Sequence, residues 1–123
     1  MKTTIDTLAA SISKILESYA DDVSVDVAEV TKSMAKRGVT ALKRESRTKF
    51  GGTGEYAKGW KADTKVQRLY TSSTIYNTKP GLPHLLEHGH AKVNGGRVPG
   101  VAHIAPVEQE LIKTFEREVL SKL

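Results

Sequence analysis

The chain has 123 residues, a net charge of +5 and no cysteine. This length indicates a single domain, residues 1–123, with a modest hydrophobic core. The missing cysteine excludes disulfides, thiolate metal sites and cysteine nucleophiles, and no apolar run approaches the ~18–20 residues that a membrane-spanning helix requires.

The charge is unevenly distributed along the chain. Residues 1–31 carry two basic and six acidic side chains, whereas residues 32–68 carry eleven basic and three acidic ones. Copies of such a protein can meet head to tail, acidic end against basic middle, or the basic middle can face nucleic acid. Composition alone leaves both interpretations open.

The N-terminal third has the apolar spacing of amphipathic helices. A first helix is predicted over residues 4–20, and Asp21 and Asp22 are expected to interrupt it. A second helix then runs over about 23–46, although the β-branched residues near Val25 leave a strand possible at its start. Gly38 predicts a kink or a close packing contact. The first apolar face consists of Ile5, Leu8, Ile12, Ile15, Leu16 and Tyr19.

Two strands are predicted after a glycine-rich loop at residues 51–54. Residues 59–67 alternate, with Trp60 and Val66 among the side chains on one face and Lys61 and Lys65 on the other. Residues 69–77 are rich in threonine, tyrosine and isoleucine. The short connection between them predicts an antiparallel hairpin, which must lie on the helices because a lone hairpin is marginal in water.

The last part is predicted to contain a short helix, a long loop and a final helix. Residues 83–88 begin with Pro83 and are followed by Gly89, the usual helix boundaries. A glycine-rich loop over 89–103, mobile around 89–101, then leads to a helix from Pro106 to about Lys122. The predicted fold class is therefore α+β, a small antiparallel sheet packed against N-terminal helices and a C-terminal helix, with a long Gly-rich loop.

The segment His84-Leu85-Leu86-Glu87-His88 fits the H-x-x-E-H pattern of inverted zinc peptidases. On a helix both imidazoles share a face, and Glu87 would be the base. However, the helix is too short to support rigid ligands. A metal-binding hydrolase stays a distant alternative.

No nucleophile–base constellation, such as a Gly-x-Ser-x-Gly elbow, occurs in the chain. We therefore expect no enzymatic activity, no catalytic residue, no metal and no cofactor. Helix-turn-helix spacing, zinc fingers and aromatic–basic RNA motifs are also missing. The basic middle still suits a surface that contacts DNA phosphates without reading sequence, so a small DNA-contacting accessory protein is the main alternative function.

Three short motifs, in their order, resemble a known family. The first is Gly52-Thr53-Gly54 followed by the Trp60 strand, the second Leu86-Glu87-His88-Gly89-His90, and the third Val101-Ala102-His103-Ile104-Ala105-Pro106. Over roughly residues 45–120 the chain resembles the gene-product-ten-like tail-component family of tailed bacteriophages, the head–tail joining or tail-completion proteins. The chain has Ala102-His103-Ile104 where family members often have Arg-Pro-Phe.

The resemblance implies a structural virion protein without enzymatic activity, assembled in the host cytoplasm and located in the neck or tail. It would form a homo-oligomeric ring in the virion from subunits that can stay monomeric in solution, and bind stopper or connector proteins and tail-terminator or tail-tube proteins. Non-specific contact with passing DNA is also implied, without membrane contact. Glu87, Lys92 and Arg97 are the predicted assembly-interface residues, and removal of residues 92–99 is expected to leave a folded subunit that cannot join head to tail.

Overall fold

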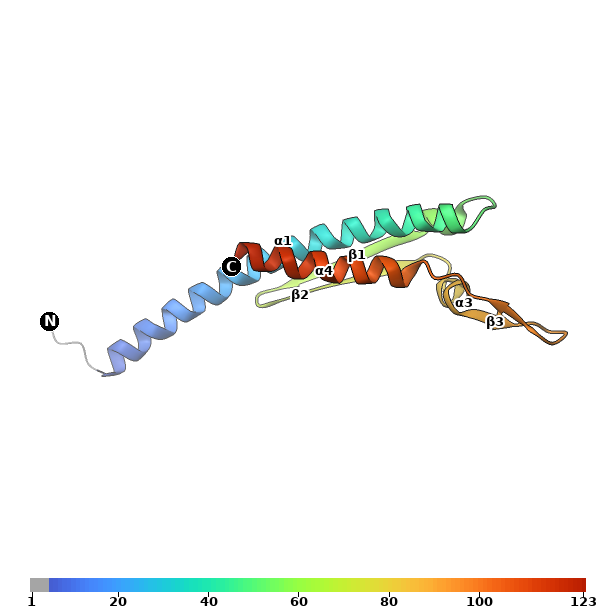
Figure 1. Cartoon of the computed structure of the whole chain (residues 1–123). Coiled ribbons are helices and arrows are strands. Elements are labelled where there is room, and N and C mark those ends of the chain that lie inside the picture. The colour runs from blue at the N-terminus through green and yellow to red at the C-terminus, as the bar shows by residue number, and fades with distance from the viewer. Residues whose placement is uncertain (1–4) are drawn as a thin grey trace.

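The computed structural model describes residues 5–123, and side chains from residue 7 onward. One long helix, α1 (Ile5–Lys49), forms the axis of an elongated molecule (Figure 1). A β-hairpin and the C-terminal helix α4 (Ile104–Lys122) both pack along its second half. The first half of α1 extends beyond them at one end, and a small α/β unit projects at the other. The α+β class predicted from the sequence is confirmed.

The prediction of two N-terminal helices is wrong, because α1 continues through Asp21 and Asp22. Neither glycine nor proline lies near these positions, and aspartate in a helix costs only a few tenths of a kcal/mol, less than ~0.7, relative to alanine. Asp21 instead forms an ion pair with Arg68 at the hairpin turn, with Oδ1 and Nε 3.1 Å apart. The possible strand near Val25 is helical as well.

The predicted hairpin is confirmed with slightly shorter strands. Strands β1 (Trp60–Gln67) and β2 (Tyr70–Asn77) pair antiparallel, with Trp60 opposite Asn77 and Thr64 opposite Ser73. Trp60 is buried and Thr64 half-buried, whereas Val66, at the far end of the same face, is exposed. Trp60 and Thr64 lie on the face toward α1 as predicted, but α1 covers only part of that face.

The core is a thin layer between α1, the hairpin and α4. Leu42, Trp60 and Val107 form its centre. A Cβ atom placed on Gly38 would lie 2.6 Å from Ile75 Cδ1 and 2.8 Å from a Leu111 methyl carbon. Gly38 therefore makes the close packing contact that was one of its two predicted roles, since it lets both side chains approach the α1 backbone.

The glycine-rich segment after the hairpin has regular structure, which corrects the prediction of a long loop. Helix α2 (Glu55–Lys58) precedes β1, and helix α3 (Leu82–His88) follows β2. Strands β3 (Gly89–Ala91) and β4 (Arg97–Pro99) then pair as a second antiparallel hairpin. Its turn uses Gly95 and Gly96 at positive φ, a conformation that glycine adopts without strain.

The final helix begins two residues earlier than predicted, at Ile104 rather than Pro106. Proline within the first turn is compatible with this start, because that turn's N–H groups have no partners within the helix. None of the helices in residues 5–123 combines the length and apolar character needed to cross a membrane.

Candidate assembly surfaces

The α3–β3–β4 unit is joined to the body through Glu87. Its Oε1 accepts the backbone N–H groups of His103 and Ile104, each at 2.8 Å, and its Oε2 accepts that of Ala105 at 3.0 Å. The carboxylate thus satisfies the unpaired donors at the start of α4 and meets the positive end of the helix dipole. This contact joins two segments that lie sixteen to eighteen residues apart.

Burial alone would raise the pKa of the Glu87 carboxyl group. The three backbone donors and the nearby His103 ring outweigh that effect, so its pKa lies below the ordinary value. Glu87 is therefore a buried anion that holds the α3–β3–β4 unit on α4. The sequence assigned it to an interface between subunits, and the structure places its carboxylate in a contact within the chain.

His103 is completely buried at the same joint. Its Nδ1 lies 2.9 Å from both Val101 O and Glu87 Oε1, and its Nε2 lies 2.7 Å from the Tyr56 hydroxyl. Because both groups facing Nδ1 are acceptors, Nδ1 carries a proton. Burial, followed by the charge of Glu87, raises the pKa of Tyr56 to about 12.

Aromatic rings enclose this network. Phe50 and Tyr56 both meet the His103 ring edge to face, with centroids 4.7 and 5.7 Å away. Trp60 donates its indole N–H to Ser46 at 2.8 Å, another buried polar contact. The buried polar side chains of this group are all hydrogen-bonded, and His103 itself is closed to solvent, as expected for a structural joint. The sequence pointed to His103 only as part of the third motif and did not predict its role in this joint.

The HLLEH segment lies on α3 as predicted, but its three polar side chains do not converge. The His84 and His88 rings are exposed with centroids 4.8 Å apart, whereas the Glu87 carboxylate binds the start of α4. Across residues 5–123, no three histidine, aspartate or glutamate side chains are arranged to hold a metal ion. The geometry that the peptidase hypothesis needs is not formed.

The other two predicted interface residues lie on the β3–β4 hairpin, which projects from one end of the molecule (Figure 1). Both Lys92 and Arg97 are exposed. Arg97 donates an Nη2 hydrogen bond to His88 O at 2.8 Å and so braces the hairpin against α3. Within the described residues neither cation forms an ion pair, as no Asp or Glu oxygen lies within 4.0 Å. The hairpin thus presents positive charge at its outer end.

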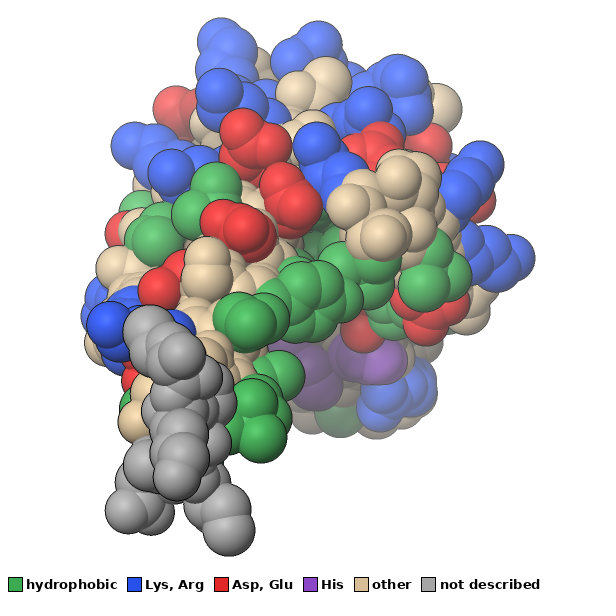
Figure 2. Space-filling view, turned by 90° about the vertical axis from the view of Figure 1, so that its left-hand side faces the viewer, with side chains coloured by type: hydrophobic (Ala, Val, Ile, Leu, Met, Phe, Trp, Pro, Cys, Tyr) green, Lys and Arg blue, Asp and Glu red, His purple; other side chains and the backbone are tan. Residues whose placement is uncertain are grey.

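The opposite end of the molecule is the first half of α1. We call residues 7–20 the arm. Its large apolar side chains repeat at three- and four-residue steps and are between 48% and 67% exposed: Leu8, Ile12, Ile15, Leu16 and Tyr19. Figure 2 views the molecule from this end and shows hydrophobic side chains gathered across the middle of the face. The sequence predicted the apolar stripe but not that it would lack a covering element.

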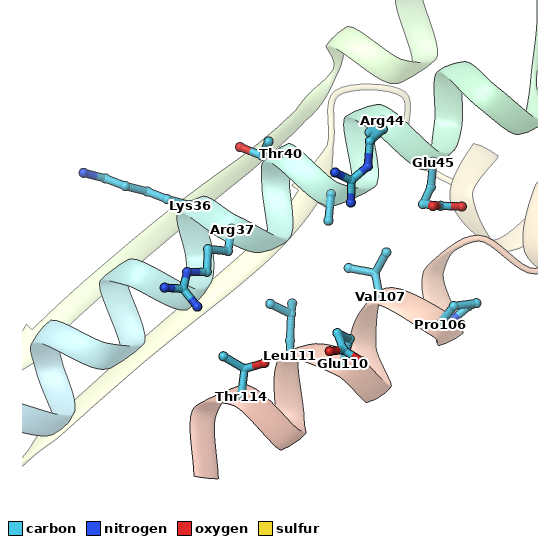
Figure 3. A pocket seen from close by; sticks show the side chains of 11 residues that line it. Lys36, Arg37, Thr40, Arg44, Glu45, Pro106, Val107, Glu110, Leu111 and Thr114 are labelled. Carbon is cyan, nitrogen blue, oxygen red and sulfur yellow. The ribbon is translucent and has the colours of Figure 1, made fainter. Parts of the chain in front are cut away.

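Two open grooves flank α4. The first lies between α1 and α4, holds about 650 Å³ and has basic side chains on its α1 edge, including Lys36, Arg37 and Arg44 (Figure 3). The second lies between β2 and α4, which both pack on α1 and make few contacts with each other. It consists of two hollows of about 710 and 380 Å³ that share Ile75, Leu111 and Ile112. We call it the β2–α4 groove.

Four of the basic residues of α1 also fall on one face. Lys32, Lys36, Lys43 and Arg47 lie at helical steps of four, seven and four residues, which places them along one side of α1. Three of them are exposed and Lys43 is half-buried. This row holds four of the eleven basic side chains in residues 32–68.

Comparison with protein families, with curated proteins and with solved structures finds no match to this chain.

Proposed function

We propose that this protein is a structural subunit of the head–tail connector or tail end of a tailed bacteriophage, where copies form a ring that joins the capsid neck to the tail. The main support for this proposal is that the protein exposes two different surfaces at its two ends. A small body bears an uncovered apolar helix at one end and a cationic hairpin at the other. A contiguous exposed apolar surface such as the stripe of the arm marks an interaction site.

Two features support assembly rather than catalysis. His103 is completely buried, and neither it, Tyr56 nor Glu87 lines either groove. A subunit with different surfaces at its two ends makes heterologous contacts, which generate rings when the rotation closes. In this arrangement the β3–β4 hairpin, with Lys92 and Arg97, would face a neighbouring neck or tail protein.

The protein's presence in purified virions tests the proposal. We expect peptides of this chain in density-purified particles, and we expect phage lacking its gene to accumulate filled heads and separate tails. Electron microscopy of the lysate distinguishes the two outcomes. Particles that lack the protein, or normal joined virions without its gene, would end the structural interpretation.

The basic row on α1 favours a second candidate function, contact with DNA. Four cations on one helix face could follow a phosphate backbone. Binding to random duplex DNA at physiological ionic strength, weakened when Lys32 and Lys36 are changed to glutamine, would favour it. Binding that is undetectable at that ionic strength would reject it.

A further inference from the structure

The arm has no partner within its own chain, although the chain also contains an apolar groove of similar length. At ~1.5 Å per residue, the stripe from Leu8 to Tyr19 is about 17 Å long, and the α4 wall of the β2–α4 groove from Ile104 to Glu116 is about 18 Å long. Both surfaces are apolar. The groove exposes Ile112 (51%), next to Leu111 and to the core residue Trp60.

The arm cannot reach the groove of its own chain. α1 continues without a break from Tyr19 to Thr31, where the groove begins, and this distance is about 18 Å along a straight helix. Folding back would require breaking α1 in a region that has no glycine or proline. Only another molecule can bring such a helix to this groove.

The face that the arm presents suits an apolar groove. Lys14 and Glu17, the charged residues of residues 8–19, lie on the opposite side of the helix from the stripe. Small residues such as Ser11 and Ser18 flank the stripe and allow close approach. Amphipathic helices bind hydrophobic grooves through residues spaced in this way.

We infer that the arm of one copy lies in the β2–α4 groove of a second copy. Its five large side chains, about half to two-thirds exposed, supply on the order of 500 Å² on one partner and about 1,000 Å² in total, the lower limit for a specific interface. The contact is heterologous, since arm and groove are different surfaces. With one arm in one groove, each pair keeps a free arm and a free groove, so further copies can extend it into a chain or ring, whereas two copies that exchange arms close as a dimer.

Disulfide trapping tests the contact directly, because the natural chain has no cysteine. One variant carries Ser11→Cys on the arm, and the other carries Glu108→Cys or Glu116→Cys at the two ends of the groove, with a tag that separates the chains by mass. After mixing and mild oxidation, we expect the mixed dimer to form at least tenfold more than with a Thr40→Cys control. Thr40 is exposed and lines the α1–α4 groove instead.

A second change verifies that the arm's apolar face makes the contact. Adding Ile12→Asp and Ile15→Asp to the arm variant alters only exposed positions, so the chain keeps its fold by circular dichroism while the mixed dimer falls about tenfold. A mixed dimer no more abundant than the Thr40→Cys control would overturn the inference, as would dominant arm–arm dimers of Ser11→Cys.

The arm–groove contact would be one of the contacts within the proposed ring. The contact and the proposed function can be tested and rejected separately. Absence of the protein from virions would remove the proposed function without affecting the disulfide result. Absence of the arm–groove disulfide in the purified chain would remove this contact and leave the virion role intact.

Discussion

At the scale of single residues, Glu87 contributes most to placing one part of the molecule on another. Its carboxylate meets three backbone donors at the first turn of α4 and the buried His103 ring. Its helical position could be predicted, since a glycine two residues later indicates the end of α3. Its partners could not be predicted, because they follow a hairpin whose formation only the folded chain reveals.

We predict that Glu87→Gln lowers the free energy of unfolding by about 1–3 kcal/mol, since one amide oxygen cannot accept three N–H groups and the amide NH₂ faces a donor. Urea denaturation at pH 7 measures the loss. Glu116→Gln, a change at an exposed position on α4, is the control and should stay within about 0.5 kcal/mol.

We also predict that the stability difference between the natural protein and Glu87→Gln depends on pH. The pKa of Glu87 is lower in the folded chain than its ordinary value of 4.5. The stabilisation is therefore fully present above pH 4.5 and is lost as pH falls through the lower folded pKa. The stability difference between the natural protein and Glu87→Gln should shrink below pH 4.5, and a difference that stays constant down to pH 3 would contradict this assignment.

At the scale of secondary-structure elements, α1 organises the fold because both the hairpin and α4 pack on it. Gly38 allows the closest approach, with Ile75 on one side and Leu111 on the other. The sequence indicated a special position at Gly38 but offered both a kink and a contact. The structure shows the contact, because Ile75 and Leu111 both approach the α1 backbone at Gly38.

We predict that Gly38→Ala changes the free energy of unfolding by less than about 1 kcal/mol. The helix gains about 1 kcal/mol from alanine, and the methyl ends of Ile75 and Leu111 rotate away at a similar cost. Gly38→Leu should cost about 2–3 kcal/mol, because the larger side chain separates the elements. Thermal or urea unfolding measures the stabilities of the natural protein and the two Gly38 variants, with Thr40→Leu as a control at an exposed position. Equal stability of the two Gly38 variants would contradict the close contact.

Continuity of α1 is tested at Asp22, an exposed residue between the arm and the body. Proline in a helix interior costs about 3 kcal/mol. An isolated helix as short as the arm is marginal in water. Asp22→Pro should therefore lower the far-UV helix signal by roughly a fifth while the unfolding midpoint of the body changes little. Asp22→Ala should keep the full signal, and identical spectra for both variants would indicate two separate helices.

At the scale of the whole molecule, the chain is an elongated rod with a different surface at each end. A compact protein of this length has a radius of gyration of about 14 Å, whereas α1 alone is about 67 Å long. This shape follows from α1 projecting past the hairpin at one end and the β3–β4 unit at the other.

Small-angle X-ray scattering of the dilute chain should give a radius of gyration above about 18 Å, well above the value for a compact domain. Removal of residues 1–20 should lower it, since the body then ends near the hairpin turn. A value near 14 Å for the full chain would show that the arm folds back on the body.

Local sequence patterns predict the elements whose residues lie close together in the chain: the alternating hairpin strands, the short α3 ended by Gly89, the final helix and the apolar stripe of the arm. These depend on the spacing of nearby residues. Three features appear only in the folded chain: Asp21 and Asp22 continue one helix, β3 and β4 pair, and Glu87 binds the start of α4. The first and last of these involve contacts between distant segments, of Asp21 with Arg68 and of Glu87 with the start of α4. The same holds for the arm, because a periodic stripe specifies which face is apolar, whereas the packing of the other elements determines whether that face is covered.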